Sequence, residues 1–406
     1  MLRHPRYLDI GRRFRHKENW HDAEPLFFAQ EGADLYNLSF VSKNAHFLTG
    51  CPSYSCPEHG LTFPGEPTVQ QPADADVVEN IRFRYPLVRE HGTRGSLRPH
   101  RHCVILLHGL NEHSFTKYLP WAYTLWSQTG WPVILFPLTF HINRVLPQWA
   151  RHQEQSFTLR QRLAENENVH RFNAVISERL AIHPERFFWG ALQSYHDLVD
   201  LVHAIRKGAH PHIAPDARID LLGFSAGGYI ALVLLLEDAG GLFANSRGVL
   251  FATCAAVRNI NLSSPLIVDL MAEVALMKLY VKHREKLSSQ RMSHWFHEHP
   301  EGRWLDAFCG LMPDHARLEA RLRALGPRLL GIANTNDQVM PAAEMLNMLA
   351  GIRRDTGVRV EELPLGIHEN PFAIADYHQR DRAIVMETLD EERFGKEFQQ
   401  FMENII

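Results

Sequence analysis

The chain has 406 residues and a formal net charge of −3, from 43 lysines and arginines against 46 aspartates and glutamates. This balance excludes the basic surplus usual for nucleic-acid binding, and an apolar fraction of 45% excludes a largely disordered chain. No apolar run reaches the about 18 residues that span a membrane, and the cysteines are too few and scattered for a disulfide framework. We therefore expect a cytoplasmic protein. The sequence leaves its oligomeric state open.

Residues 1–101 are predicted to form an N-terminal extension that is rich in loops. The prolines and glycines between residues 50 and 72 indicate irregular structure in that stretch. Residues 81–85 alternate between apolar and polar side chains, which predicts a half-buried strand. We expect this strand to lie at the edge of a sheet.

From residue 102 onward, short apolar runs alternate with helical patterns. Runs at 104–107, 133–136 and 219–222 predict buried strands. Three more strands are predicted at 249–251, 329–332 and 358–360. Apolar spacing predicts helices near 115–126, 192–205, 227–238, 341–352 and 380–403. The alternation predicts an α/β domain over 102–406, with a mostly parallel sheet and helices on both of its faces.

Two long stretches interrupt this alternation, at 139–188 and 259–325, and both have mainly helical patterns. We interpret them as cap insertions over the carboxyl edge of the sheet, where open α/β sheets hold their sites. In the second stretch, apolar residues recur at helical spacing from Leu266 to Tyr280. This pattern predicts a helix that covers the site, with Met271 and Val274 in contact with substrate. A surface that touches lipid is the alternative.

The sequence Gly223-Phe224-Ser225-Ala226-Gly227 carries the sharpest chemical signal. It lies between a predicted buried strand and a predicted apolar helix, which is the setting of a nucleophile elbow. Because such a turn is sharp and strained, the residues two before and two after the serine must lack bulk. The pattern predicts that Ser225 Oγ stands clear at the end of the strand as a nucleophile. A plain strand–helix turn is the alternative.

A serine nucleophile needs a base, and the base needs an acid that orients it. Asp337 follows the strand predicted at 329–332, and His368 follows the strand predicted at 358–360. Because the carboxyl ends of parallel strands meet at one edge, both side chains are expected beside Ser225. Their order, serine then acid then histidine, is that of α/β-hydrolases.

Two backbone N–H groups are expected to stabilise the oxyanion. One is that of Ala226, directly after the nucleophile, and the other is that of Leu110, in the loop after the strand at 104–107. Gly109 lets the backbone of this loop approach a substrate, and Asn111 is expected to contact the substrate.

At these motifs, residues 102–400 resemble the α/β-hydrolase superfamily. The segment 108–114, His-Gly-Leu-Asn-Glu-His-Ser, with Lys117-Tyr118 after it, is similar to the H-G-x-G-E-H-S-x-R-Y segment of the monoacylglycerol-lipase and serine-aminopeptidase-like branch. The resemblance implies the fold, an acyl-enzyme mechanism and the site roles named above. The chain departs from the branch at Asn111, where a second glycine is usual, and it lacks a G-H-G-x-S loop after the next strand. The resemblance therefore does not identify the substrate.

These observations predict a serine hydrolase that cleaves a carboxylic ester or related acyl bond of a small-molecule substrate, with no metal and no organic cofactor. A peptidase, thioesterase or acyltransferase on the same fold is the first alternative. A catalytically inactive hydrolase-fold binding protein is the second.

Two other groups of residues contain side chains that could bind a metal. Cys51, Cys56 and His59 have a spacing that a metal site could use, but we expect no metal there, and a metal site is only the alternative. The histidines in the sequence His-Trp-Phe-His-Glu-His, at 294–299, match no trusted zinc spacing. We expect these histidines on a solvated surface.

Overall fold

The computed structural model describes residues 26–28, 32–66, 72–92, 98–150, 152–284, 289–308, 315–351 and 353–372. The helix predicted at 380–403 lies outside these ranges. Five short 3₁₀ helices occur in the described part, at Ala45–Phe47, Asp74–Asp76, Asp238–Gly240, Val257–Asn259 and Gly326–Arg328.

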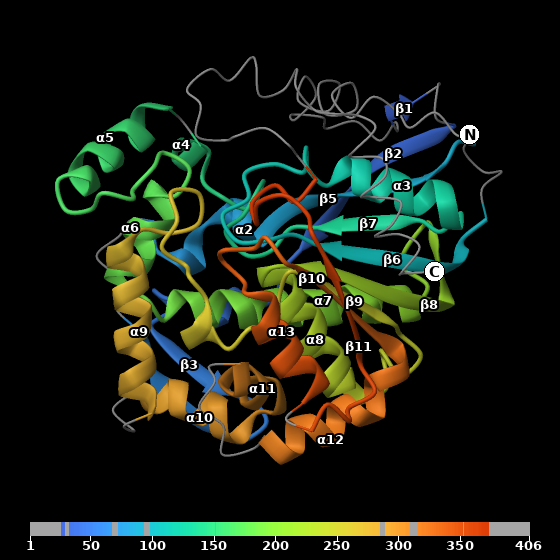
Figure 1. The fold of residues 1–406 in the computed structure, drawn as a ribbon. Helices are drawn as coiled ribbons and strands as arrows, with labels where there is room; N and C mark the ends of the chain where they lie inside the picture. Colours follow the sequence, from blue (N-terminus) through green and yellow to red (C-terminus); the bar gives the residue numbers. More distant parts are fainter. Residues whose placement is uncertain are drawn as a thin grey trace.

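A nine-stranded sheet runs through the middle of the described part (Figure 1). In spatial order its strands are β1 (Leu26–Phe28), β2 (Ala33–Val41), β5 (Arg82–Glu90), β7 (Val133–Phe136), β6 (His100–Leu107), β8 (Ile213–Phe224), β9 (Gly248–Phe251), β10 (Leu329–Asn334) and β11 (Arg359–Leu363). Neighbours from β7 to β11 are parallel, and the three pairings from β1 to β7 are antiparallel. All six strands predicted from apolar runs are present, and this order is that of the α/β-hydrolase fold.

Successive side chains of a strand point to opposite faces, and both faces are buried in β7, β9 and β10 and in the C-terminal parts of β6 and β8. The edge strand β11 is mostly exposed or half-buried. In β6, Ile105 and Leu107 join one apolar cluster, and Val104 and Leu106 join the other. The first cluster contains side chains of α7 (Arg186–Arg206), α8 (Ala226–Glu237) and α13 (Ala342–Ala350), and the second contains those of α3 (Leu119–Thr129). The predicted helices on both faces are therefore confirmed.

The N-terminal part differs from the sequence-based expectation in two respects. Strand β5 is not an edge strand, because β2 pairs along one side of it and β7 along the other. The region 50–72, predicted as loop, contains a two-stranded hairpin of β3 (Ser53–Cys56) and β4 (Leu61–Pro64). The first expectation was wrong because β2, which pairs with β5, lies far from it in the sequence. The second was wrong because the hairpin lies in a stretch dense in proline, a composition that usually indicates loop. A short helix, α2 (Val78–Ile81), leads into β5.

The two insertions are mainly helical, as predicted. The first contains α4 (Pro147–Ala150), α5 (His152–Leu163) and α6 (Ala174–Ile182), and the second contains α9 (Leu270–Arg284), α10 (Gln290–Glu298), α11 (Pro300–Phe308) and α12 (His315–Leu325). Helices α5, α6 and α9 lie together on the side toward which the parallel strands point (Figure 1). None of the helices in the described part is long and apolar enough to cross a membrane.

A buried ion pair joins the two insertions. The guanidinium of Arg162 donates from Nε and Nη2 to the two carboxylate oxygens of Asp269, at 2.6 and 2.7 Å. Such a two-pronged contact fixes direction as well as distance. Asp269 also accepts from the N–H of Ala272, so it caps the start of α9. The pair thus holds α5 and α9 in one cap.

Candidate active site

Ser225 lies in the turn between β8 and α8, with a positive φ of 52°. The glycines on either side are needed for space. A Cβ added at Gly223 would come within 2.5 Å of Gly228 Cα, and one added at Gly227 within 2.5 Å of the Leu107 carbonyl oxygen. The strained turn is held by a hydrogen bond from the Ser225 N–H to Phe251 O, at 3.0 Å. This turn therefore has the steric features of a nucleophile elbow.

Three of the predicted site residues form a continuous hydrogen-bonded chain. Nε2 of His368 lies 2.9 Å from Ser225 Oγ, and Nδ1 of the same ring lies 2.6 Å from Asp337 Oδ2. All three residues are buried, at 5%, 2% and 8% exposure for Ser225, His368 and Asp337. Because Oδ2 of Asp337 accepts from Nδ1, the other ring nitrogen, Nε2, is free to accept the serine proton.

The second carboxylate oxygen of Asp337 is held by the backbone. Oδ1 accepts from the N–H groups of Val339 and Met340, at 2.8 Å each. These bonds fix the carboxylate plane, so that Oδ2 stays directed at His368. Asp337 therefore bonds to the backbone of the loop before α13 and to His368, and it does not cap α13, whose N-cap residue is Pro341.

Two asparagines that the sequence interpretation overlooked hold the acid loop to the histidine loop. Asn334 Nδ2 donates to Gly366 O at 2.6 Å, and Asn336 Nδ2 donates to Leu365 O at 2.7 Å. Asn334 Oδ1 also accepts from the Leu365 N–H, at 3.1 Å. Their position directly before Asp337 was the available signal, since Asn side chains readily bond to nearby backbone.

The loop after β6 is held by its own side chains. The Gly109 N–H donates to the Tyr118 hydroxyl at 3.0 Å, and this hydroxyl donates to Glu112 Oε1 at 2.6 Å. Lys117 forms an ion pair with the same carboxylate. Leu110, at the turn of this loop, and Ala226, the first residue of α8, both line the cavity that Ser225 borders. The first N–H groups of a helix have no partner within it, so the Ala226 N–H is available to a ligand.

His108 connects this loop to the loop after β7. Its Nδ1 lies 2.7 Å from Gly109 O, and its Nε2 accepts from the Leu138 N–H at 2.9 Å. Burial holds the pKa of His108 well below its usual range. The ring is therefore neutral, with the proton on Nδ1, and acts as a fixed strut between the two loops.

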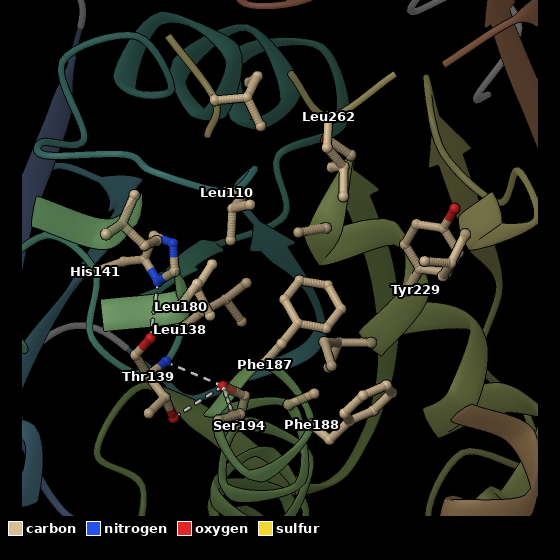
Figure 2. A pocket seen from close by; sticks show the side chains of 18 of the residues that line it. Leu110, Leu138, Thr139, His141, Leu180, Phe187, Phe188, Ser194, Tyr229 and Leu262 are labelled. Atoms are coloured by element: carbon tan, nitrogen blue, oxygen red, sulfur yellow. Dashed lines mark hydrogen bonds between the residues drawn. The ribbon is translucent and has the colours of Figure 1, made fainter. Parts of the chain in front are cut away.

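An apolar cavity of about 140 Å³ opens beside Ser225 and His368. Both insertions line it. The first supplies apolar side chains that include Leu180, Phe187 and Phe188, and the second supplies Leu262, with Leu110 completing the wall (Figure 2). Thr139 and Ser194 are polar, but they bond to each other at 3.0 Å. The cavity therefore suits an apolar group next to the serine.

Two arginines of the cavity wall share one acidic partner in the N-terminal segment. Arg179 and Arg186 both bond to the carboxylate of Asp74, the latter from Nε at 2.6 Å. Asp74 is fully buried. Burial lowers the pKa of Arg179 to about 10, which Asp74 opposes. Asp74, from the segment before residue 102, thus holds two side chains of the cavity wall in place without lining the cavity itself.

Three residues expected to contact substrate lie elsewhere. Met271 and Val274 are 43% and 37% exposed on the outer face of α9 and do not line the cavity; the buried face of this helix carries Ala272 and Leu276 instead. Helical spacing could not distinguish the two faces, because both are apolar. Asn111 donates from Nδ2 to Leu266 O at 2.7 Å, so it ties the loop after β6 to the cap.

A second group of reactive side chains gathers outside the cavity. Cys56, His59, His294 and His299 place one ligand atom each within 4.8 Å of one another. The expectation of a solvated surface is wrong for His294 and His299, which are only 8% and 2% exposed. Sequence spacing missed the group because its halves lie more than two hundred residues apart.

The family described as "Family of unknown function (DUF6051)" matches residues 1–391 of the chain, and no curated protein matches it in sequence. Similar solved structures include an esterase of Pyrobaculum calidifontis, at 10% identity and a TM-score of 0.44 over 97% of this chain and 88% of that chain. Another is the esterase Est22, at 12% identity and a TM-score of 0.44 over 91% of this chain and 79% of that chain. A third is brefeldin A esterase, described as a bacterial homologue of human hormone-sensitive lipase. It is 12% identical, with a TM-score of 0.44 over 97% of this chain and 83% of that chain.

Proposed function

The chain belongs to the family of unknown function DUF6051, and we propose that it is a serine hydrolase that cleaves a carboxylic ester or related acyl bond. One observation carries this proposal: the hydrogen-bonded chain from Ser225 through His368 to Asp337, at the border of an apolar cavity. A nucleophile, a base and an orienting acid in this order are the parts that acyl transfer requires.

In the proposed first step, Ser225 Oγ attacks the substrate carbonyl carbon while His368 Nε2 takes the hydroxyl proton. Asp337 stabilises the imidazolium that forms. The bond to the leaving group then breaks, and His368 returns the proton to the departing alcohol oxygen. An acyl group remains on Ser225. Water attacks this ester by the same route, with His368 again as base, and releases the carboxylic acid.

The oxyanion of each tetrahedral intermediate would be stabilised by the N–H groups of Leu110 and Ala226. A single donor of this kind contributes about 3 kcal/mol to lowering the barrier. The bonds of Gly109 and His108 support this role, because they fix the loop that carries Leu110. We infer that the Glu112–Tyr118 bond serves the same purpose and accounts for the motif shared with the monoacylglycerol-lipase-like branch.

The cavity supports an apolar acyl group as the part of the substrate next to Ser225. Its volume of about 140 Å³ is close to that of an engineered protein cavity of roughly 150 Å³ that holds benzene. We therefore propose short to medium acyl chains, and the protein needs no metal at this site for the proposed steps.

A fluorophosphonate probe tests the proposal directly, because it reacts only with a serine that is activated as a nucleophile. We expect the purified chain to be labelled, and Ser225→Ala to abolish labelling. Ser127→Ala, on α3, is the matched control and should label like the parent. A parent chain that is folded but not labelled would instead support a hydrolase-fold binding protein.

Substrate panels separate the remaining alternatives. We expect turnover of p-nitrophenyl esters, with aminoacyl anilides and acyl-CoA thioesters turned over much more slowly. Preference for anilides would indicate a peptidase, and preference for acyl-CoA would indicate a thioesterase. Transfer of the acyl group to an alcohol in place of water would indicate an acyltransferase.

A further inference from the structure

Four potential metal ligands come together where the N-terminal segment meets the second insertion. Cys56 ends β3, and His59 lies in the turn between β3 and β4. His294 lies on α10, and His299 lies between α10 and α11. Cys56 and His299 are 1% and 2% exposed and His294 is buried, whereas His59 is exposed, so three of the four side chains are shielded from water.

Their ligand atoms converge on a common point. Sγ of Cys56 lies 3.3 Å from Nδ1 of His59 and 3.3 Å from Nε2 of His299. Nε2 of His299 lies 3.2 Å from Nε2 of His294. A tetrahedral zinc ion with Zn–N near 2.0–2.1 Å and Zn–S near 2.3 Å separates its ligand atoms by about 3.3–3.6 Å. The three observed separations are about 0.1–0.3 Å shorter than these edges, and all four ligand atoms lie within 4.8 Å of one another.

Two carboxylates lie near the other ring nitrogen of His299. Nδ1 is 3.5 Å from a carboxylate oxygen of Glu58 and 3.9 Å from one of Glu301, and it forms no hydrogen bond within the described residues. The two carboxylates therefore place negative charge beside the ring, and this charge would partly balance a bound cation. The ring of Trp295 stacks on His299 with centroids 3.6 Å apart, which restrains its plane.

We propose that Cys56, His59, His294 and His299 bind one zinc ion as a closed, four-coordinate structural site. One thiolate with three imidazoles is a donor set that favours zinc over magnesium or calcium, which prefer oxygen ligands. Two residues separate Cys56 from His59 in the hairpin, and four separate His294 from His299 at the helix corner. The second spacing falls within the three to five residues found between zinc-finger histidines, so the sequence interpretation, which saw no zinc spacing here, was wrong on this point. Binding displaces the proton of the Cys56 thiol, so the Zn–S bond forms as a proton goes to solvent.

The site would join two parts of the chain that are distant in sequence. It fixes the β3–β4 hairpin against the corner between α10 and α11. Helix α11 carries Leu305 and Phe308 into the wall of the apolar cavity. The zinc would thus hold one wall of that cavity in place without touching Ser225, and the inference stands whether or not the chain is an esterase.

Metal analysis of the untagged full-length protein tests the proposal. We expect about one zinc per chain by inductively coupled plasma mass spectrometry, after purification without chelator. Cys56→Ser and His299→Ala should each lose this zinc. Cys51→Ser and His297→Ala are matched controls, since they alter a cysteine and a histidine of the same two segments outside the cluster, and both should retain it.

Two further measurements keep the test decisive if a ligand variant folds poorly. The wild-type protein, stripped with a chelator and reloaded with cobalt, should show the intense visible bands of a four-coordinate ion and a thiolate charge-transfer band. Stripping should lower its melting temperature by several degrees, and zinc should restore it. A wild-type chain that holds only trace zinc before and after incubation with the ion would overturn the proposal. Retention of full zinc by both ligand variants would also overturn it.

Discussion

Oδ2 of Asp337 lies 2.6 Å from Nδ1 of His368, although 31 residues separate them in the chain. The reason is the parallel pairing of β10 with β11, in which Asn334 lies opposite Leu363. The loops that follow these two strands therefore start side by side. Asn334 and Asn336 then bond across from one loop to the other. The register of β10 and β11 brings the two loops together, and the contact between Asp337 and His368 then forms within that arrangement.

His368→Ala is expected to lower kcat about as much as Ser225→Ala does, by roughly 10⁶ if the three residues act as a unit. The physical reason is that Ser225 Oγ is a weak nucleophile without a base at 2.9 Å. Steady-state hydrolysis of a p-nitrophenyl ester measures both variants. The double variant should be no slower than either single one, and multiplied losses would contradict a shared mechanism.

Asp337→Asn is expected to lower kcat by about 10⁴ and to leave KM nearly unchanged. The amide would present a donor where the carboxylate accepts from Nδ1, so the ring would hold its proton on the wrong nitrogen. Asp355→Asn, at an exposed ion pair with Arg323, is the control and should keep full activity. A large rise in KM at unchanged kcat would assign Asp337 to substrate binding.

The acyl preference is expected to follow the cavity. kcat/KM should rise about fourfold per methylene, from about 0.8 kcal/mol of apolar burial each, until the cavity is filled. Leu262→Ala should move the optimum to longer p-nitrophenyl esters, because this side chain lines the cavity. Met271→Ala, on the exposed face of α9, should leave the optimum in place. A shift in the second variant but not the first would assign the acyl site to α9.

Stability is expected to fall as the pH falls below about 6.5. Burial lowers the pKa of His141 to about 4, so the unfolded chain binds this proton at a higher pH than the folded chain does. The contribution is fully present above about 6.5 and declines toward pH 4, by about 2 kcal/mol at pH 5. Urea denaturation at pH 7 and pH 5 measures it. His141→Gln should show a smaller loss between the two values than wild type, and His203→Gln, an exposed control, should show the same loss as wild type.

Much of the fold and most of the candidate site could be predicted from local patterns. The inner parallel strands, such as β7, β9 and β10, are short runs of apolar residues because both of their faces are buried, and that requirement is visible in the sequence. The elbow around Ser225 could also be predicted from local sequence, because the two glycines that leave space for the sharp turn lie within a five-residue segment. Asp337 and His368 could be placed because the carboxyl ends of parallel strands meet at one edge.

The remaining features depend on contacts between segments that no local period reports. Only the tertiary structure shows that β2 pairs with β5, or that Met271 of α9 is exposed to solvent while Ala272 is buried. The same holds for Asp74, whose buried carboxylate joins two arginines of the cavity wall. Cys56 and His299 are 243 residues apart and touch at 3.3 Å. Spacing within each half signals little, because a metal site needs four ligands around one point, and only the folded chain brings these halves together.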